Sequence, residues 1–305
     1  IHLLIWTLIP SISNLNLPLD TIEALAWGSN LDWGFNKHPP LSALAAEVFF
    51  IVFNNADWAY YLLSQIFVVV AFFVVWKFSN CIFEDKIYSL ISVLLLEGIY
   101  FFNFTTPEFN VNVCQLPFWA LTVYYCWESV KNNRIQNWLF FGFFAALGFL
   151  SKYLFLYLLL GIKLYFLDKI IREKRFNFKY LIPVLIFLIL IIPHLIWLFD
   201  NDYASIKYAF SRTNLEKVSL ASHLFLPLTF LFKQIGILIP FFLIFIFIVK
   251  KTKVKINLKD KKLLFLIAVN LIPITLMFTT SLLFGVKIRT MWMTPFYLFF
   301  GVFIV

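Results

Sequence analysis

Long apolar segments recur along the whole chain, and they limit its possible folds more than any other feature of the sequence. Residues 181–199 and 235–249, for example, contain no charged side chain. A helix needs about 20 mostly apolar residues to cross the hydrocarbon core of a bilayer, whereas a barrel strand alternates apolar and polar residues over about ten. The continuous segments therefore predict membrane-spanning helices.

Composition supports a membrane location. Of the 305 residues, 62% are hydrophobic, 13% are charged and 40 are Phe, whereas a soluble domain is about a quarter charged and about half apolar. A soluble fold could not cover this much apolar surface, so we expect an all-α polytopic membrane protein with about ten transmembrane helices. The expected spans are 1–12, 58–78, 87–102, 111–130, 138–150, 154–167, 180–199, 224–249, 263–284 and 291–305.

Basic residues predict the orientation of these helices, because cytoplasmic loops carry an excess of Lys and Arg. Seven Lys and Arg lie in one set of loops, and sixteen lie in the opposite set at 77–86, 131–134, 169–179 and 250–262. The richer set is expected to be cytoplasmic. Outward-facing parts are then the segment 14–57, the loops Thr105–Asn110 and Ser151–Tyr153, and the loop 200–223. Topology thus accounts for the net charge of +9, and no nucleic-acid partner is expected.

The outward segment 14–57 is the longest part of the chain that is not expected to span the membrane, and it gathers acidic residues. Its pattern predicts two short interfacial helices, Thr21–Ser29 and Leu41–Phe50, and Pro-Pro precedes the second as is common at a helix start. Asp20 and Glu23 are candidates for chemistry at this interface. The alternative is a capping box, in which an N-cap acid and a Glu three residues later bind free backbone amides.

Two motifs in this segment carry a family resemblance. Leu31–Phe35 reads Leu-Asp-Trp-Gly-Phe and Lys37–Leu41 reads Lys-His-Pro-Pro-Leu, with Asp20 opening the segment. The pattern resembles the first outer loop of glycosyltransferase family 39, which includes dolichyl-phosphate-mannose-protein mannosyltransferases and bacterial relatives such as the lipid A aminoarabinose transferase. The resemblance implies the C-type glycosyltransferase fold. Thr21 departs from the pattern, because the family usually has a second acid there.

Three later segments match the same family in the same order. Thr106-Pro107-Glu108 is similar to a Thr-Pro-Asp motif of the second outer loop, Ser151-Lys152-Tyr153 matches a Ser-Lys-Tyr motif, and the loop with Asp202 and Arg212 resembles the fourth outer loop. Each has a structural alternative. Pro107-Glu108 is also a common helix start, Lys152 can reach the lipid headgroups by snorkelling, and the last loop can be ordinary solvated chain.

The resemblance implies an inverting transferase that moves a sugar from a polyprenyl-phosphate donor to an acceptor hydroxyl. Such a reaction needs a carboxylate that accepts the proton of the attacking hydroxyl and positive groups that stabilise the leaving phosphate. By position and resemblance Asp20 is the expected base and Glu108 a second acid, with Glu23, Asp32 and Asp202 as secondary candidates. The candidates for holding the donor phosphate are Lys37, His38, Lys152 and Arg212.

The expected partners are the lipid-phosphate sugar donor, the bilayer, and a glycolipid, glycan or protein acceptor. The sequence leaves a divalent cation open as a cofactor. We expect the bacterial inner membrane as the location, with the catalytic loops on the periplasmic side. One alternative is an oligosaccharide ligase or polymerase, which would share the basic outer loops. The other is a transporter of lipid-linked sugars, which predicts charged residues near the midplane of broken helices. Residues 1–305 are expected to form one transmembrane domain, truncated at both ends and lacking any C-terminal outer domain.

Overall fold

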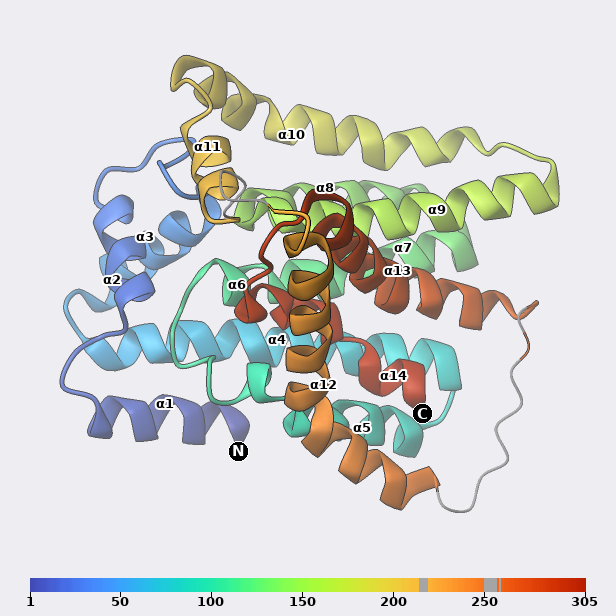
Figure 1. Cartoon of the computed structure of the whole chain (residues 1–305), viewed down its shortest axis with the longest axis horizontal. Coiled ribbons are helices and arrows are strands. Elements are labelled where there is room, and N and C mark those ends of the chain that lie inside the picture. Colours follow the sequence, from blue (N-terminus) through green and yellow to red (C-terminus); the bar gives the residue numbers. More distant parts are fainter. Residues whose placement is uncertain (214–218, 250–256, 258) are drawn as a thin grey trace. The chain divides into compact units, whose positions relative to one another are not determined.

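The computed structural model describes residues 1–213, 219–249, 257 and 259–305, and in these residues every regular element is a helix (Figure 1). The expected all-α class is confirmed. Two compact units divide the chain, and each combines segments that are distant in sequence. The first unit consists of Ile1–Val74, Phe101–Phe155 and Lys179–Ala209; the second consists of Val75–Tyr100, Leu156–Phe178 and Phe210–Val305.

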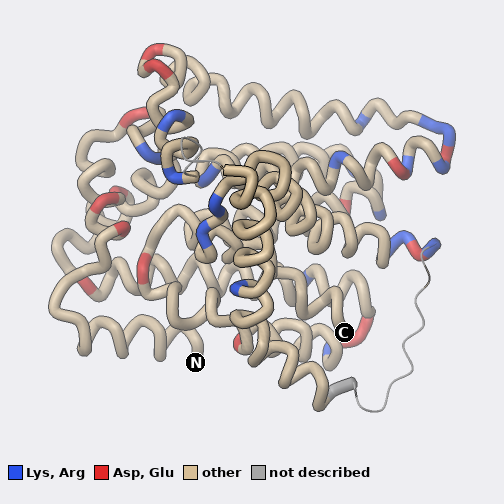
Figure 2. Tube along the Cα trace, in the orientation of Figure 1, with Lys and Arg blue, Asp and Glu red and all other residues tan. Residues whose placement is uncertain are grey.

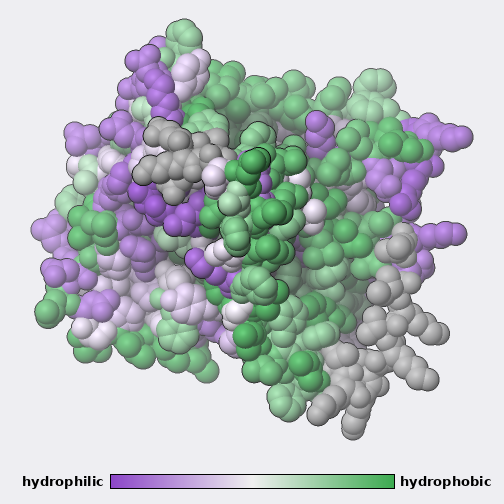
Figure 3. All heavy atoms as spheres, in the orientation of Figure 1, coloured by the Kyte–Doolittle hydropathy of each residue, from purple (hydrophilic) through white to green (hydrophobic). Residues whose placement is uncertain are grey.

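Four helical segments in the described part of the chain are long and apolar enough to cross a membrane. They are α4 (Asp57–Phe83), Phe178–Asp200, Ser222–Phe247 and Lys261–Phe284. Many of their large apolar side chains are exposed on the protein surface, and Figure 3 shows this for α12 (Ser222–Val249), whose visible face is largely green. Burying such surface requires lipid, so the chain is an integral membrane protein.

The first unit holds most of the segments that were expected to face outward, namely 14–57, 105–110, 151–153 and 200–209. Its central helix α8 (Ile135–Ser151) packs against α7 (Leu116–Asn132) and α10 (Leu181–Asp200), while α2 (Leu19–Gly28) packs against α3 (Leu41–Phe53). Gly142 allows the close approach of α8 to α10, because a Cβ there would lie 2.6 Å from the carbonyl oxygen of Pro183. Its shorter elements are α1 (His2–Ser13), α6 (Val111–Cys114) and the 3₁₀ turn η3 (Tyr153–Phe155).

The second unit is built around α13 (Lys261–Phe284), which packs against α9 (Leu156–Glu173) and α12. Phe78, near the end of α4, contacts both Phe265 and Phe299 in its core, with ring centroids 6.0 and 5.0 Å away. The remaining elements are α5 (Lys86–Leu94), the 3₁₀ helices η1 (Leu95–Gly98) and η6 (Thr290–Tyr297), and α14 (Phe300–Ile304).

Three expected spans are wrong as single helices. Residues 87–102 end their α-helix at Leu94 and continue as 3₁₀ turns, and residues 111–130 break between α6 and α7, where Pro117 starts a new helix. Residues 291–305 form η6 and α14, with Pro295 interrupting the hydrogen-bond ladder. Most side chains from 293 to 302 are buried, so their apolar character reflects contact with protein instead of lipid.

Loops that were expected to be cytoplasmic contact one another within each unit. In the first unit Lys179 Nζ donates to the carbonyl oxygen of Asn133 at 2.8 Å. In the second, Lys262 Nζ donates to the carbonyl oxygen of Ile82 at 2.6 Å, and Lys261 lies 3.3 Å from Glu173. Figure 2 shows these Lys and Arg in blue at the α9–α10 connection and at the start of α13. Residues 250–256 and 258 of the last basic loop lie outside the described residues.

Candidate active site

Helix α2 carries Asp20 and Glu23 on the face that lines a small open pocket. The helix begins at Leu19 after Pro18, whose extended backbone makes it the N-cap. Asp20 is therefore in the first turn, where negative charge is favourable, and the capping-box alternative is wrong. Positions 20, 23, 24 and 27 follow the helical i, i+3, i+4, i+7 spacing, and all four line the pocket.

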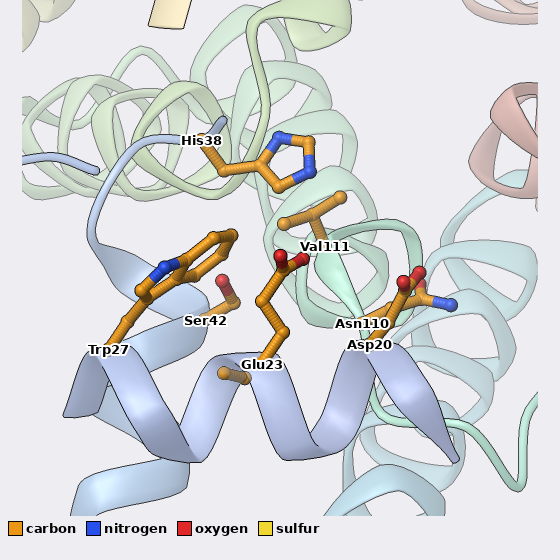
Figure 4. A pocket seen from close by; sticks show the side chains of 8 residues that line it. Asp20, Glu23, Trp27, His38, Ser42, Asn110 and Val111 are labelled. Carbon is orange, nitrogen blue, oxygen red and sulfur yellow. The ribbon is translucent and has the colours of Figure 1, made fainter. Parts of the chain in front are cut away.

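Three further segments of the first unit complete the pocket, whose empty space of about 230 Å³ includes open solvent. Figure 4 shows the α2 side chains along one wall, with His38 above them and Ser42 of α3 behind. Asn110 and Val111, at the start of α6, close the side next to Asp20. The full lining is Asp20, Glu23, Ala24, Trp27, His38, Ser42, Asn110 and Val111.

Glu108 is bound directly to the start of α2. Its Oε1 accepts the backbone N–H of Asp20 at 3.2 Å, and its Oε2 accepts the Asn110 amide at 3.4 Å. Thr21, which stands where the family usually has an acid, donates its hydroxyl to the Phe109 carbonyl at 3.1 Å. Burial, and then the negative charge of Asp20, raise the pKa of the Glu108 carboxyl. The structure thus places the first and second outer loops in contact through these two acids.

Lys37 and His38 lie on the α2 side of the pocket. Lys37 Nζ donates to the Glu23 carboxylate and lies 5.7 Å from the centroid of the Tyr208 ring. The hydrogen bond with Glu23 raises the pKa of Lys37, so the amine stays protonated at neutral pH. His38 lies between Trp27 and Tyr208, with ring centroids 5.9 and 6.1 Å away.

Lys152 is buried within the first unit, 7% exposed, and the snorkelling alternative is therefore wrong. Its Nζ donates to the side-chain oxygen of Asn112. The backbone N–H of Asn112 in turn donates to Asn110 Oδ1 at 2.8 Å, in the N-terminal cap of α6. Lys152 is thus connected through two amides to the loop that carries Glu108, although it does not line the pocket.

Asp32 and Asp202 are not among the residues that line the pocket. Asp32 accepts the Trp33 N–H and the Trp197 indole N–H, both at 2.7 Å, and so ties the first outer loop to α10. Asp202 is exposed in the turn after α10, with a positive φ of 50°. Arg212 is exposed and belongs to the second unit.

A buried chain of hydrogen bonds, which the sequence did not predict, lies next to the contact between Asp32 and Trp197. His194 of α10 is fully buried; its Nδ1 lies 2.6 Å from the Trp33 carbonyl oxygen and its Nε2 lies 2.8 Å from the Tyr153 hydroxyl. Tyr153 lies 2.6 Å from Ser205 Oγ. A neutral imidazole satisfies both contacts if Nδ1 donates to the carbonyl and Nε2 accepts from Tyr153. The available signal was a single His inside the apolar segment 181–199.

In the described ranges, no group of three or more His, Cys, Asp or Glu side chains is placed to hold a metal ion. Asp20, Glu108 and the Asn110 amide carry oxygen atoms of the kind that bind divalent cations. The presence of such a cation stays a prediction.

Comparison with known proteins supplies a family. The family model described as dolichyl-phosphate-mannose-protein mannosyltransferase matches residues 37–197. This range starts at Lys37 and includes Glu108, Lys152 and the buried His194, while Asp20 lies upstream of it. No curated protein and no solved structure matches the chain.

Proposed function

Because the chain belongs to the dolichyl-phosphate-mannose-protein mannosyltransferase family, which implies a membrane glycosyltransferase acting with a lipid-linked sugar, we propose a specific reaction for it. The protein transfers a sugar from a polyprenyl-phosphate donor to an acceptor hydroxyl, with inversion, on the outer face of the membrane. The acceptor is a glycolipid, a glycan or a protein.

One observation carries this proposal: Glu108, predicted from a separate loop, contacts the backbone of the pocket acid Asp20. Asp20 lines the pocket, and the Glu108 carboxylate accepts the backbone N–H of Asp20. Two carboxylates that repel each other bind a proton more readily than either would alone. This supports a proton-accepting role for the pair and distinguishes the site from a surface that only binds charged lipid.

In the proposed step, Asp20 accepts the proton of the acceptor hydroxyl as its oxygen attacks the anomeric carbon. The new carbon–oxygen bond forms while the bond from the anomeric carbon to the phosphate oxygen breaks, and the bonding electrons leave with the polyprenyl phosphate. A carboxylate positioned in this way contributes about 10²–10⁴-fold to the rate. Glu108 holds the Asp20 backbone and raises the proton affinity of the pair.

The leaving phosphate gains negative charge, and nearby positive groups stabilise it. We assign this role to Lys37 and His38 beside the pocket, with Lys152 supporting the Asn110 side from within the protein. Arg212 is the further candidate for this role. Glu23 raises the pKa of Lys37 further above its ordinary value of 10.5, so the amine is positively charged at neutral pH, as binding of an anion requires.

We further propose that the two units form one C-type glycosyltransferase domain with about ten membrane spans. Within each unit, the contacts among its basic loops support one cytoplasmic side for that unit. The pocket then faces the periplasm of a bacterial inner membrane. The lipid tail of the donor remains among the apolar helices, while its phosphate reaches the interface.

The test measures sugar transfer from a panel of labelled polyprenyl-phosphate sugars in membranes that contain the protein or its Asp20→Asn variant. Asp200→Asn is the matched control, because Asp200 is an exposed acid at the end of α10. We expect Asp20→Asn to lower transfer by about 10²–10⁴-fold and Asp200→Asn to leave it unchanged. Full activity in Asp20→Asn would move the base elsewhere, and consumption of no donor would favour the ligase or transporter alternatives.

A further inference from the structure

Ser42 places a buried hydroxyl at the pocket. The residue is 1% exposed, and its Oγ has no hydrogen-bond partner among the described residues. A helical Ser commonly donates to the carbonyl four residues earlier, as Ser129 and Ser151 do. For Ser42 that carbonyl belongs to His38, and it accepts the Phe35 N–H at 3.0 Å instead.

The groups around Ser42 match the chemistry of a sugar ring. Figure 4 shows its hydroxyl pointing toward the space between Trp27 and Glu23. Carboxylates accept hydrogen bonds from hydroxyls, and the Asn110 amide can donate or accept them. Trp27 stacks on Phe35 at 5.3 Å and is also one of the residues that line the pocket. Such pockets bind a ligand through apolar contact and orient it through a few polar groups.

Charge argues against a phosphate in the same place. Asp20 and Glu23 both line the pocket, and an anion between them would face two negative charges. Lys37 neutralises Glu23 through their ion pair but does not itself line the pocket. A neutral ring with several hydroxyls meets no such repulsion, and the phosphate attached to it can lie at the edge, near Lys37 and His38.

We propose that this pocket binds the sugar ring of the substrate and that Ser42 makes a hydrogen bond to one of its hydroxyls. Ser42 is then a specificity-determining residue that distinguishes a sugar with that hydroxyl from one without it. The identity of the ring as the transferred sugar rests on the proposed function, whereas binding of a sugar ring here can be measured without it.

The experiment compares wild-type protein, Ser42→Ala and Ser79→Ala with the best polyprenyl-phosphate donor and each of its monodeoxy analogues. Ser79 is the matched control, because it is also fully buried without a hydrogen-bond partner in the described chain and lies in α4, in the second unit. Both kcat/KM for transfer and donor affinity, from tryptophan fluorescence of the purified protein, are measured. Thermal stability in detergent is recorded for all three.

We expect Ser42→Ala to lower kcat/KM for the complete sugar about three- to tenfold and to leave one monodeoxy donor unaffected, so that discrimination at a single hydroxyl disappears. Stability should not fall, since the variant removes only an unpartnered hydroxyl. Ser79→Ala should change neither quantity. An equal loss against every donor, or no loss, would overturn the inference and leave the proposed function standing.

The binding measurement separates this inference from the proposed function. If no donor is transferred but Ser42→Ala weakens binding of the complete sugar and not of one deoxy analogue, the pocket binds a sugar and the proposed reaction is wrong. If no donor is transferred and wild type and variant bind every sugar equally, both ideas fail.

Discussion

Replacing His194 by Phe tests whether the buried hydrogen-bonded chain holds the first outer loop in place. The change keeps an aromatic ring that can stack on Trp197, as the imidazole does at 6.0 Å, but removes the contacts to Trp33 and Tyr153. A buried group left without its partner costs about 1–3 kcal/mol. Trp33 is 55% exposed and Tyr153 keeps Ser205, so each loss falls near the lower limit, giving about 2 kcal/mol in total.

A free-energy change of this size raises the open population of the loop about 30-fold. Trypsin cleavage after Lys37 reports this open population, because Lys37 lies in the loop that the hydrogen bonds of His194 hold in place. The cleavage rate of a transiently open segment follows the population of the open state when reclosing is fast. We therefore expect cleavage after Lys37, followed by mass spectrometry, to accelerate about 30-fold in His194→Phe. Transfer activity should fall with it, since His38 lies on the same loop.

Tyr157→Phe is the control for this experiment. It removes a half-buried hydrogen bond of 2.9 Å to Thr280 in the second unit, so cleavage after Lys37 should not change. The reasoning is refuted if His194→Phe folds normally and shows wild-type cleavage after Lys37, because the contacts of His194 would then contribute nothing to holding the loop.

Two further variants test the packing and the charge of the site. In Gly34→Ala the new Cβ would lie 2.3 Å from the Trp197 ring. We expect this variant to lose about 1–3 kcal/mol of stability, measured by unfolding in detergent. Gly236→Ala is the control and should lose none, because no atom lies within 4 Å of the new Cβ. Because the folded-state pKa of Glu108 is raised above 4.5, the folded protein binds more protons than the unfolded chain, and stability falls as the pH rises from 4.5 through the folded pKa. Glu108→Gln should abolish this fall in pH-dependent thermal unfolding, and an unchanged profile would contradict the charge repulsion by Asp20.

Much of the candidate site was predictable because its signals are local. Asp20, Glu23 and Trp27 follow the helical spacing of a single short segment, and the predicted helix Thr21–Ser29 differs from α2 mainly in starting after Asp20. The contact of Glu108 with Asp20 joins residues 88 positions apart, and only an agreement of topology and family order brought them into one prediction. Asp32 was expected near the chemistry, yet it binds the Trp197 indole, because the indole of a helix far along the chain needs an acceptor.

His194 and Ser42 could not be predicted in their roles, since a lone polar residue in an apolar segment carries no information about its partner. What the sequence by itself determined is the membrane as solvent and the helical class, because hydrophobicity acts residue by residue. The tertiary structure alone decided that residues 181–199 form one long helix while residues 291–305 form short buried turns. The physical reason is that lipid tails and protein interiors are similarly apolar. A run of hydrophobic residues therefore does not show whether lipid or protein will surround it.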